Sequence, residues 1–435
     1  MLNIAAFARS KGVFYGWVLV GLGASVFAVS SGAVYYTFGV YIGPVVEEMG
    51  WSRGATSIAF SLFTIINGGT GPFVAMLIER IGVRRAMLAG QVLVIAGLYM
   101  LSLMTHLWHL YALYGVLLGI GLGSTSYVSM TTLFNTWFTR RRSLAIGIAM
   151  AGSGLGTVIM APMIRYLIEV IGWRDSWRVL AAVAFVFAFV PTLILARDRP
   201  QDVGLEPERD AQSTPGDVKR RMRPYNTAVD WTARSAFRTP ALWLITFMAF
   251  SNSFALSMMT SHQVIHLEDV GIAPVVAASA LGLMVATSSA GRLACGVLGQ
   301  WFQLRYVAAV ALSLQVVGLL LLMFARNLPM VYAYVICFGP AYGTMVILFP
   351  SIVGAYFGRK SYAYIFGILF AIVSLASAGS PLLAGYVFDA LGSYRIPFSA
   401  AATISALAAC AALLAKPPAM RTGGSPSDIS AVPAR

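Results

Sequence analysis

Long apolar runs cover most of the chain and are separated by short polar stretches. Each run is about 20 residues or longer, which is enough for a helix to cross a hydrocarbon core of about 30 Å. We predict twelve such helices. They cover residues 14–38, 55–78, 86–105, 110–136, 143–170, 177–196, 241–266, 274–300, 306–325, 329–356, 361–387 and 397–415. The pattern therefore predicts an all-α membrane protein embedded in a lipid bilayer.

The composition supports this prediction. Hydrophobic residues make up 58% of the 435 positions, charged residues make up 11%, and the mean hydropathy is +0.78, whereas roughly a quarter of the residues of soluble domains are charged. The first run carries Trp17 and lacks a small-residue cleavage site, so we expect it to be a span and not a removable signal peptide. The cysteines Cys295, Cys337 and Cys410 all fall in apolar runs, which favours buried small side chains over a disulfide or metal site. No cofactor is expected.

The net charge of +14 is explained by its distribution. If both termini are cytoplasmic, the cytoplasmic segments hold 23 of the 30 Lys and Arg residues, the outer segments hold six, and Arg292 is the remaining one. This bias is typical of cytoplasmic loops in membrane proteins. We therefore expect cytoplasmic termini, a bacterial inner membrane as the location, and no nucleic-acid partner.

One polar segment divides the chain. Residues 197–238 are rich in both charges and contain proline. They predict a cytoplasmic linker between an N-terminal six-helix half, 1–196, and a C-terminal six-helix half, 239–416. The tail, 417–435, contains Pro, Gly and Ser and predicts a disordered cytoplasmic segment.

The two predicted halves are similar to each other. At an offset of 219 residues, Trp137 overlays Tyr356 and Phe138 overlays Phe357. Two parallel six-helix repeats joined by a long loop are typical of a transporter that rocks its halves about a central site.

The loop "AMLIERIGVRRAM", residues 75–87, places an acid at the end of one helix, then a glycine and two arginines. It resembles the signature loop between helices 2 and 3 of the major facilitator superfamily, with Ala75 where glycine is usual and Glu79 where aspartate is usual. The resemblance implies the major facilitator fold and contacts that close the cytoplasmic side in one state. The gating residues of this loop would be Glu79, Arg80, Arg84 and Arg85. A solvated inner loop is the alternative, and it would account for the arginines but not for the acid or the glycine.

Other segments resemble the bacterial monocarboxylate-transporter and oxalate/formate-antiporter-like branch of that superfamily. They are "GWVLVGLG" (16–23), "YYTFGVYIGPVVEEMGWSR" (35–53), "RPQDVGLEPE" (199–208), "HQVIHLEDVGI" (262–272) and "AGRLACG" (290–296). The resemblance implies transport of a small carboxylate.

Arg292 lies inside the eighth apolar run without a counter-charge. A charge at the centre of a membrane helix costs roughly 2.5 to 3.5 kcal/mol on insertion scales, so it needs a partner or a wet cavity. Ser288 and Ser289 precede it by one turn, Cys295 and Gly296 follow by one turn, and all sixteen acids fall at helix ends, in the linker or in the tail. An anionic substrate would supply the charge, because a guanidinium matches a carboxylate through two hydrogen bonds. The alternative is an arginine that snorkels or binds backbone carbonyls.

The resemblance implies carboxylate binding for this arginine, with two departures. Ser288 stands where many eukaryotic monocarboxylate transporters have an aspartate. Residues 364–388 lack the second cation of the oxalate transporters, which favours a monoanion over a dianion.

Further candidates follow from their positions on the predicted helices. Beside Arg292 and Ser288, the substrate-binding candidates are Tyr127, Tyr342, Phe370 and Ser374. Interhelical or lipid contacts are the alternative for each. His262 can titrate near neutral pH but lies near the outer end of helix 7, so we expect an outer-gate or structural role.

Together with the unpaired Arg292, the resemblance implies, as the leading hypothesis, a secondary transporter of small monocarboxylates of the lactate or pyruvate type. We expect it to be coupled to a proton, to work by alternating access and to act as a monomer. The alternatives are an exchanger of the oxalate/formate type, a proton-coupled exporter of another organic anion, and a membrane-embedded sensor or enzyme. An enzyme is disfavoured because we find no metal-ligand cluster, nucleophile–base pair or phosphate-binding loop.

Overall fold

The computed structural model describes residues 14–125, 127–138, 142–205, 227, 231–299, 301–358 and 362–418. Within these ranges the regular structure is entirely helical. The first half contains α2 (Tyr15–Val29), η1 (Ser30–Tyr35), α3 (Phe38–Met49), α4 (Arg53–Gly69), α5 (Gly71–Ile81), α6 (Val83–Leu101), α7 (Leu107–Leu110), η2 (Tyr111–Leu118), α8 (Gly119–Thr125), α9 (Tyr127–Trp137), α10 (Arg142–Ala184), η3 (Phe185–Phe189) and α11 (Val190–Leu195). After these come η4 (Pro200–Val203), α12 (Ala233–Phe237), α13 (Pro240–Asp269), α14 (Pro274–Leu298), α15 (Leu304–Met323), α16 (Leu328–Phe357), α17 (Tyr362–Leu391) and α18 (Arg395–Leu414).

The prediction of an all-α membrane protein is confirmed. The described residues form ten helices that are long and apolar enough to span a membrane, or eleven when α4 and α5, bent by 52°, count as one span. The longest stretch, Ala145–Leu195, has 51 residues and is interrupted at Gly172, where φ is 80° and ψ is 162°. At 1.5 Å per residue it is more than twice as long as a bilayer core requires. It therefore contains two of the twelve expected spans.

The first span is longer than predicted. The expected helix at 14–38 continues through α3 to Met49 after an irregular turn at Tyr36 and Thr37. Pro44 and two glutamates hid this extension in the sequence pattern, although a proline can be accommodated in a membrane helix. Gly50, with a φ of +66°, ends the helix in a left-handed conformation.

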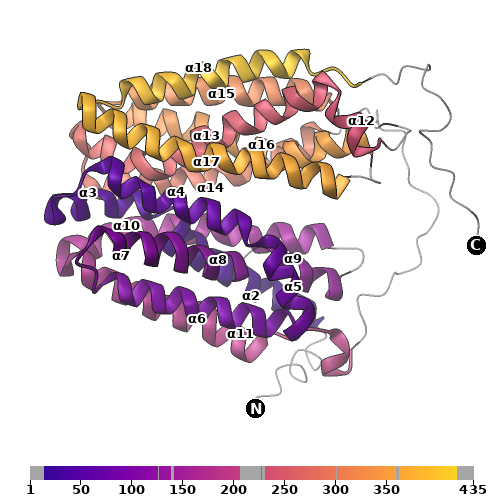
Figure 1. Cartoon of the computed structure of the whole chain (residues 1–435), viewed down its shortest axis with the longest axis horizontal. Coiled ribbons are helices and arrows are strands. Elements are labelled where there is room, and N and C mark those ends of the chain that lie inside the picture. The colour runs from indigo at the N-terminus through magenta and orange to yellow at the C-terminus, as the bar shows by residue number, and fades with distance from the viewer. Residues whose placement is uncertain are drawn as a thin grey trace, which may run out of the picture.

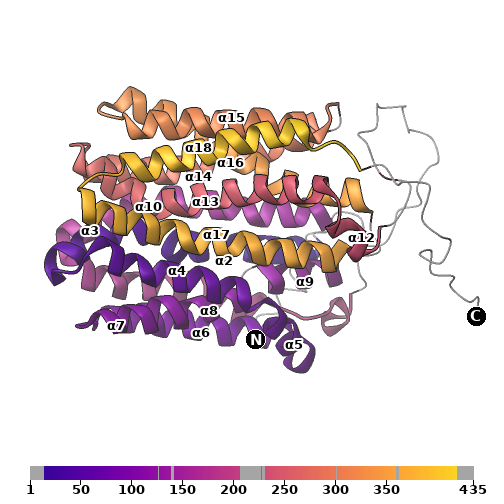
Figure 2. The ribbon, with the colours of Figure 1, turned by 45° about the horizontal axis from the view of Figure 1, so that its top comes forward.

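The helices form two bundles that lie side by side, one from the first half of the chain and one from the second (Figure 1). A turned view shows the same arrangement, with α4 beside α17 and α10 beside α14 (Figure 2). We call the end of the bundles at residues 196–205 and 231–239 the linker end, and the end at residues 49–53 and 391–395 the far end. The exact division at residues 197–238 stays a prediction, because 206–226 and 228–230 lie outside the described residues.

Two glycines allow α14 and α16 to pack closely. A Cβ on Gly291 would lie 1.9 Å from the Pro340 carbonyl oxygen, and one on Gly343 would lie 1.8 Å from that of Ser288. No side chain larger than hydrogen fits at either position, as is common where membrane helices meet. The close approach brings Arg292 of α14 next to α16.

Candidate functional site

Arg292 lies near two tyrosine hydroxyls from opposite halves. Its guanidinium interacts with Tyr342 of α16 and is within electrostatic range of Tyr36, which follows η1. The two hydroxyls are 2.8 Å apart and hydrogen-bonded, and both tyrosines are buried. This Tyr36–Tyr342 bond joins the two bundles beside the arginine.

The guanidinium is incompletely satisfied. Arg292 Nε is buried without a hydrogen-bond partner, and no carboxylate within the described ranges forms an ion pair with it. Arg292 lies six residues before Leu298, or about 9 Å along α14. The arrangement can therefore offer the free Nε–H donor and a positive charge to a small anion.

Tyr36 was not among the residues predicted from the sequence. It follows a π-helical segment, and its backbone N–H donates to the carbonyl of Ser31 over 3.0 Å. Such π-turns are frequent at functional sites because the extra residue changes the direction of the following side chains. The signal in the sequence was weak, because Tyr36 is one of several tyrosines in the first apolar run and lies near the predicted end of that run at residue 38.

The structure places the other substrate-binding candidates in different surroundings. Ser288 is fully buried, and its Oγ donates to the Val285 carbonyl over 2.6 Å. Ser374 Oγ donates to the Phe370 carbonyl over 2.9 Å and would lie 3.2 Å from a Cβ on Gly68 of α4.

Neither of these serine hydrogen bonds involves Arg292. Phe370 is exposed on the surface of its bundle and stacks on Phe366. The Tyr127 side chain lies outside the described residues. Substrate contacts by these four residues therefore stay predictions.

The predicted gating loop makes its described contacts with the end of the first half and the start of the linker. The Arg84 backbone N–H donates to Asp198 Oδ1 over 2.7 Å, and Arg84 Nη2 donates to the Leu193 carbonyl over 2.7 Å. Asp198 therefore lies at the N-terminus of α6, where a negative charge is favourable. Gly82 has a φ of +86°, and a Cβ there would lie 2.5 Å from Asp198 Oδ2.

The other gating residues of this loop, Glu79, Arg80 and Arg85, are exposed. Arg140, Gln300 and Arg359, which belong to or follow predicted helices 4, 8 and 10, lie outside the described residues. Contacts between the halves at the linker end stay a prediction.

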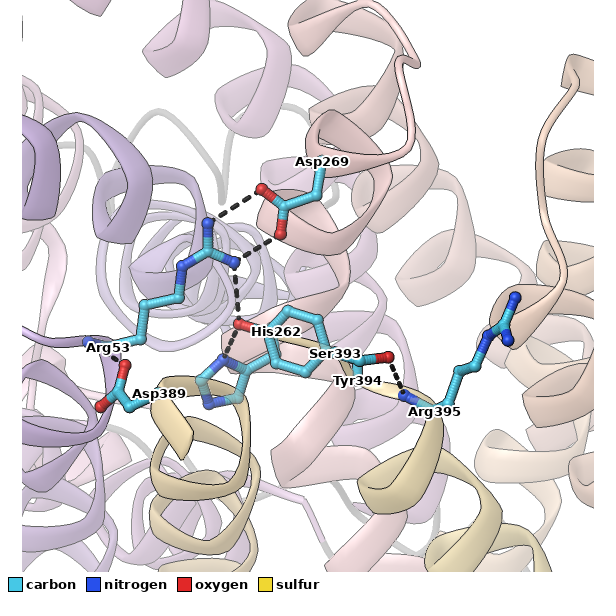
Figure 3. A network of polar contacts seen from close by, with 7 residues as sticks. All are labelled: Arg53, His262, Asp269, Asp389, Ser393, Tyr394 and Arg395. Carbon is cyan, nitrogen blue, oxygen red and sulfur yellow. Dashed lines mark hydrogen bonds and ion pairs between the residues drawn. The ribbon is translucent and has the colours of Figure 1, made fainter. Parts of the chain in front are cut away.

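A charged network joins the two halves at the far end (Figure 3). Arg53 of α4 forms an ion pair with Asp269 of α13 at 2.5 and 2.8 Å. The backbone N–H groups of Arg53 and Gly54 donate to Asp389 of α17 over 3.1 and 2.7 Å. We call Arg53, Asp269 and Asp389 the far-end latch.

His262 of α13 is completely buried behind this latch. Its Nδ1 lies 3.0 Å from the Tyr394 hydroxyl, which in turn accepts from Arg53 Nη1 over 3.3 Å. Its Nε2 lies 3.0 Å from the Pro381 carbonyl oxygen and 3.2 Å from Ser57 Oγ. Burial raises the pKa of the Tyr394 hydroxyl well above its ordinary value, so this group keeps its proton.

A pocket of about 490 Å³ also lies at the far end. Its charged lining residues are Glu47, Arg53, Arg165, Glu169, Glu268 and Asp269. Arg165 of the first half lies 3.6 Å from Glu268 of the second half. Two ion pairs and the Asp389 hydrogen bonds thus connect the halves at the far end, in addition to apolar packing.

Comparison with known proteins identifies the family. The sequence profile of the Major Facilitator Superfamily matches residues 20–349 and 263–431. The chain belongs to this superfamily. It is a multi-pass membrane protein of a transporter family and is not an enzyme.

Two relatives show the range of similarity. Monocarboxylate transporter 3 of Rattus norvegicus is 27% identical over 390 residues, which cover 88% of this chain and 76% of the relative. The oxalate:formate antiporter of Oxalobacter formigenes is 25% identical over 257 residues, which cover 59% and 57% of the two chains.

A solved structure has the same fold. It is a bacterial homologue of the human lysosomal transporter Spinster, with a TM-score of 0.66 and 16% identity over 92% of this chain and 96% of that one. The predicted family and fold are therefore confirmed.

Proposed function

We propose that this protein is a secondary transporter of small monocarboxylates, of the lactate or pyruvate type, and that Arg292 binds the carboxylate. The observation that carries the proposal is the buried Arg292 Nε without a partner, in a site between the halves where no described carboxylate neutralises the guanidinium. An arginine in this position needs an anion or water. The names of the relatives, a monocarboxylate transporter and an oxalate:formate antiporter, support an organic anion as that partner.

The chemistry of the site suits one carboxylate. A guanidinium can donate two parallel hydrogen bonds to the two carboxylate oxygens. The hydroxyls of Tyr36 and Tyr342 can donate further bonds after their mutual 2.8 Å bond is exchanged. A single cation favours a monoanion, and the residues at 364–388 add no second positive charge.

The geometry also supports alternating access. Tyr36 belongs to the first half, whereas Arg292 and Tyr342 belong to the second, so a substrate between them would contact both bundles. The latch and the Arg165–Glu268 contact close the far end. We propose that this is the inward-open arrangement and that the latch breaks when the far end opens.

The orientation and coupling are part of the same proposal. The concentration of Lys and Arg in the segments at the linker end supports cytoplasmic termini in a bacterial inner membrane, with the far end outside. We propose that an inward proton gradient drives uptake and that the monomer is the working unit. Anion exchange is the second candidate, favoured by the similarity to the oxalate:formate antiporter.

Ligand-dependent stabilisation of the purified protein tests the substrate class. Lactate, pyruvate, acetate, formate and oxalate are compared by thermal unfolding, and a ligand present at 100 times its Kd should add about 2.7 kcal/mol to the stability of the folded state. We expect a monocarboxylate to stabilise the wild type and the Arg395→Ala control, in which an exposed arginine at the far end is removed. Arg292→Ala should lose the effect. Stabilisation of Arg292→Ala equal to that of the wild type would refute carboxylate binding by this arginine.

A further inference from the structure

The far-end latch connects the two halves through one arginine. Besides its bonds to Asp269, the Arg53 guanidinium lies 4.0 Å from the centre of the Phe388 ring, over its face. Asp389 binds the first backbone N–H groups of α4, so both acids of the second half hold the same helix end of the first half. Opening the far end must break all of these contacts together.

The hydrogen bonds of His262 indicate that the imidazole is neutral when the latch is closed. A carbonyl oxygen can only accept, so Nε2, which faces the Pro381 carbonyl, carries a hydrogen. The Tyr394 oxygen accepts from Arg53, so its own hydrogen is available to Nδ1. The result is a continuous series of hydrogen bonds from Arg53 through Tyr394 and His262 to the Pro381 carbonyl, and each donated hydrogen in it has an acceptor.

A second proton on His262 is incompatible with this series of hydrogen bonds. Nδ1 would become a donor, and the Tyr394 oxygen would have to accept from both Nδ1 and Arg53 while its own hydrogen lost its acceptor. The new charge would also be placed at a site with 0% exposure, where the lost hydration is costly. Protonation therefore opposes the closed latch.

The groups around His262 determine how it responds once the latch opens. The charged or titratable groups that act on His262 from other elements are Arg53 of α4, Asp389 of α17 and Tyr394 before α18. His266 and Asp269 follow one and two turns later on its own helix, and Asp269 is paired with Arg53. His266 is engaged elsewhere, because its Nε2 lies 3.1 Å from the Leu322 carbonyl of α15. Asp269 and Asp389 together carry one more charge than Arg53. The surroundings therefore favour a positive charge on the His262 imidazole once the far end opens and water replaces the closed contacts.

We propose that His262 is a proton-binding site that keeps the far-end latch closed when it is neutral and releases the latch when it is protonated. The mechanism concerns the protein without substrate and does not depend on the substrate or the orientation proposed above. A hydrated imidazole titrates near pH 6.5. If the closed state excludes the proton, lowering the pH from about 7.5 to about 5.5 should raise the ratio of open to closed molecules about tenfold.

Distances between spin labels at the far end test this proposal. Val170 of the first half and Ile396 of the second are both exposed, and each is replaced by a labelled cysteine after Cys295, Cys337 and Cys410 are changed to alanine. The distance distribution is recorded in the purified, substrate-free protein at both pH values. Failure of the monocarboxylate proposal would leave this measurement unaffected.

Three variants separate the outcomes. We expect His262→Gln to lose the pH response, since its amide can donate to the Pro381 carbonyl but does not titrate. The matched control His266→Gln should keep the response of the wild type. Asp269→Asn should have a larger open population at both pH values and still respond to pH.

Retention of the full pH response in His262→Gln would overturn the proposal, as would a wild type whose distances do not change with pH. Thermal unfolding shows whether the glutamine variant is folded. If it is not, His262→Asn provides the same test with a smaller amide.

Discussion

Gly39 should be essential for closing the far end. It lies on α3 against α13 of the other half, and a Cβ added to it would lie 2.6 Å from the Thr260 carbonyl oxygen and 2.8 Å from that of Ser261. Both oxygens belong to backbone and cannot rotate away. Because ordinary contact begins at 3.4 Å, the two helices would have to separate by about 0.8 Å, the difference between 3.4 and 2.6 Å, to accept even an alanine.

The energetic effect follows from this overlap. Overpacking of this kind costs roughly 1 to 3 kcal/mol, which corresponds to an approximately 5- to 150-fold fall in the ratio of closed to open molecules. We expect Gly39→Ala to shift the Val170–Ile396 label distances toward the open state at neutral pH. Separation of α3 from α13 when the far end opens would relieve the clash, so the protein should remain folded.

Gly43→Ala is the matched control for this prediction. Gly43 lies one turn later on α3, and its added Cβ would lie 3.4 Å from Glu268 Oε2, the end of a flexible side chain. Both variants gain the same helix propensity from the added methyl group. The reasoning is refuted if Gly39→Ala has the same distance distribution as Gly43→Ala and the wild type.

Four further predictions concern the binding site, the coupling and the first-half loop. Arg292→Lys should weaken substrate binding about ten- to hundredfold in a binding titration, because losing a charge-assisted hydrogen bond costs roughly 1.5 to 3 kcal/mol; an unchanged Kd would contradict a bidentate contact. Tyr36→Phe should weaken binding about two- to tenfold, whereas the adjacent Tyr35→Phe, whose ring packs on Phe60 and Phe63, should not. Collapse of the pH gradient by an ionophore should abolish monocarboxylate accumulation in proteoliposomes, and a requirement for an internal anion instead would favour exchange. Gly82→Ala should lower the melting temperature, because its φ of +86° and the 2.5 Å approach to Asp198 both oppose a side chain, while Gly21→Ala, which meets nothing within 4 Å, should not.

The helical, membrane-spanning character of the chain and its family could be predicted because they depend on local patterns. Apolar runs separated by charged loops determine where helices cross a membrane, whatever their tertiary contacts. The first span was predicted to end at residue 38, whereas it continues to Met49, so about one third of its 35 residues was missed. Pro44 and the glutamates after it resemble a loop, and only the packing of α3 against α13 shows that the helix continues.

The site was predicted only in part, for a physical reason. Arg292 was identifiable because an unpaired charge in an apolar run is expensive wherever it lies. Tyr36 was not, since its position beside Arg292 depends on a π-turn in one half and on a tyrosine 306 residues later in the other. The latch was missed for the same reason: Arg53 and Asp269 lie 216 residues apart and look like ordinary charges at helix ends.

The Tyr36–Tyr342 bond has a consequence for inhibition. In the proposed mechanism, Arg292 holds a small carboxylate while the hydroxyls of both bundles, now 2.8 Å apart, close around it. A carboxylate with a bulky arm, such as an arylated propionate, would still reach the guanidinium but would keep the two rings apart. Such a compound should act as a wedge that traps one conformation and blocks the cycle without crossing the membrane, so that potency would rise with the size of the arm while transport falls to zero.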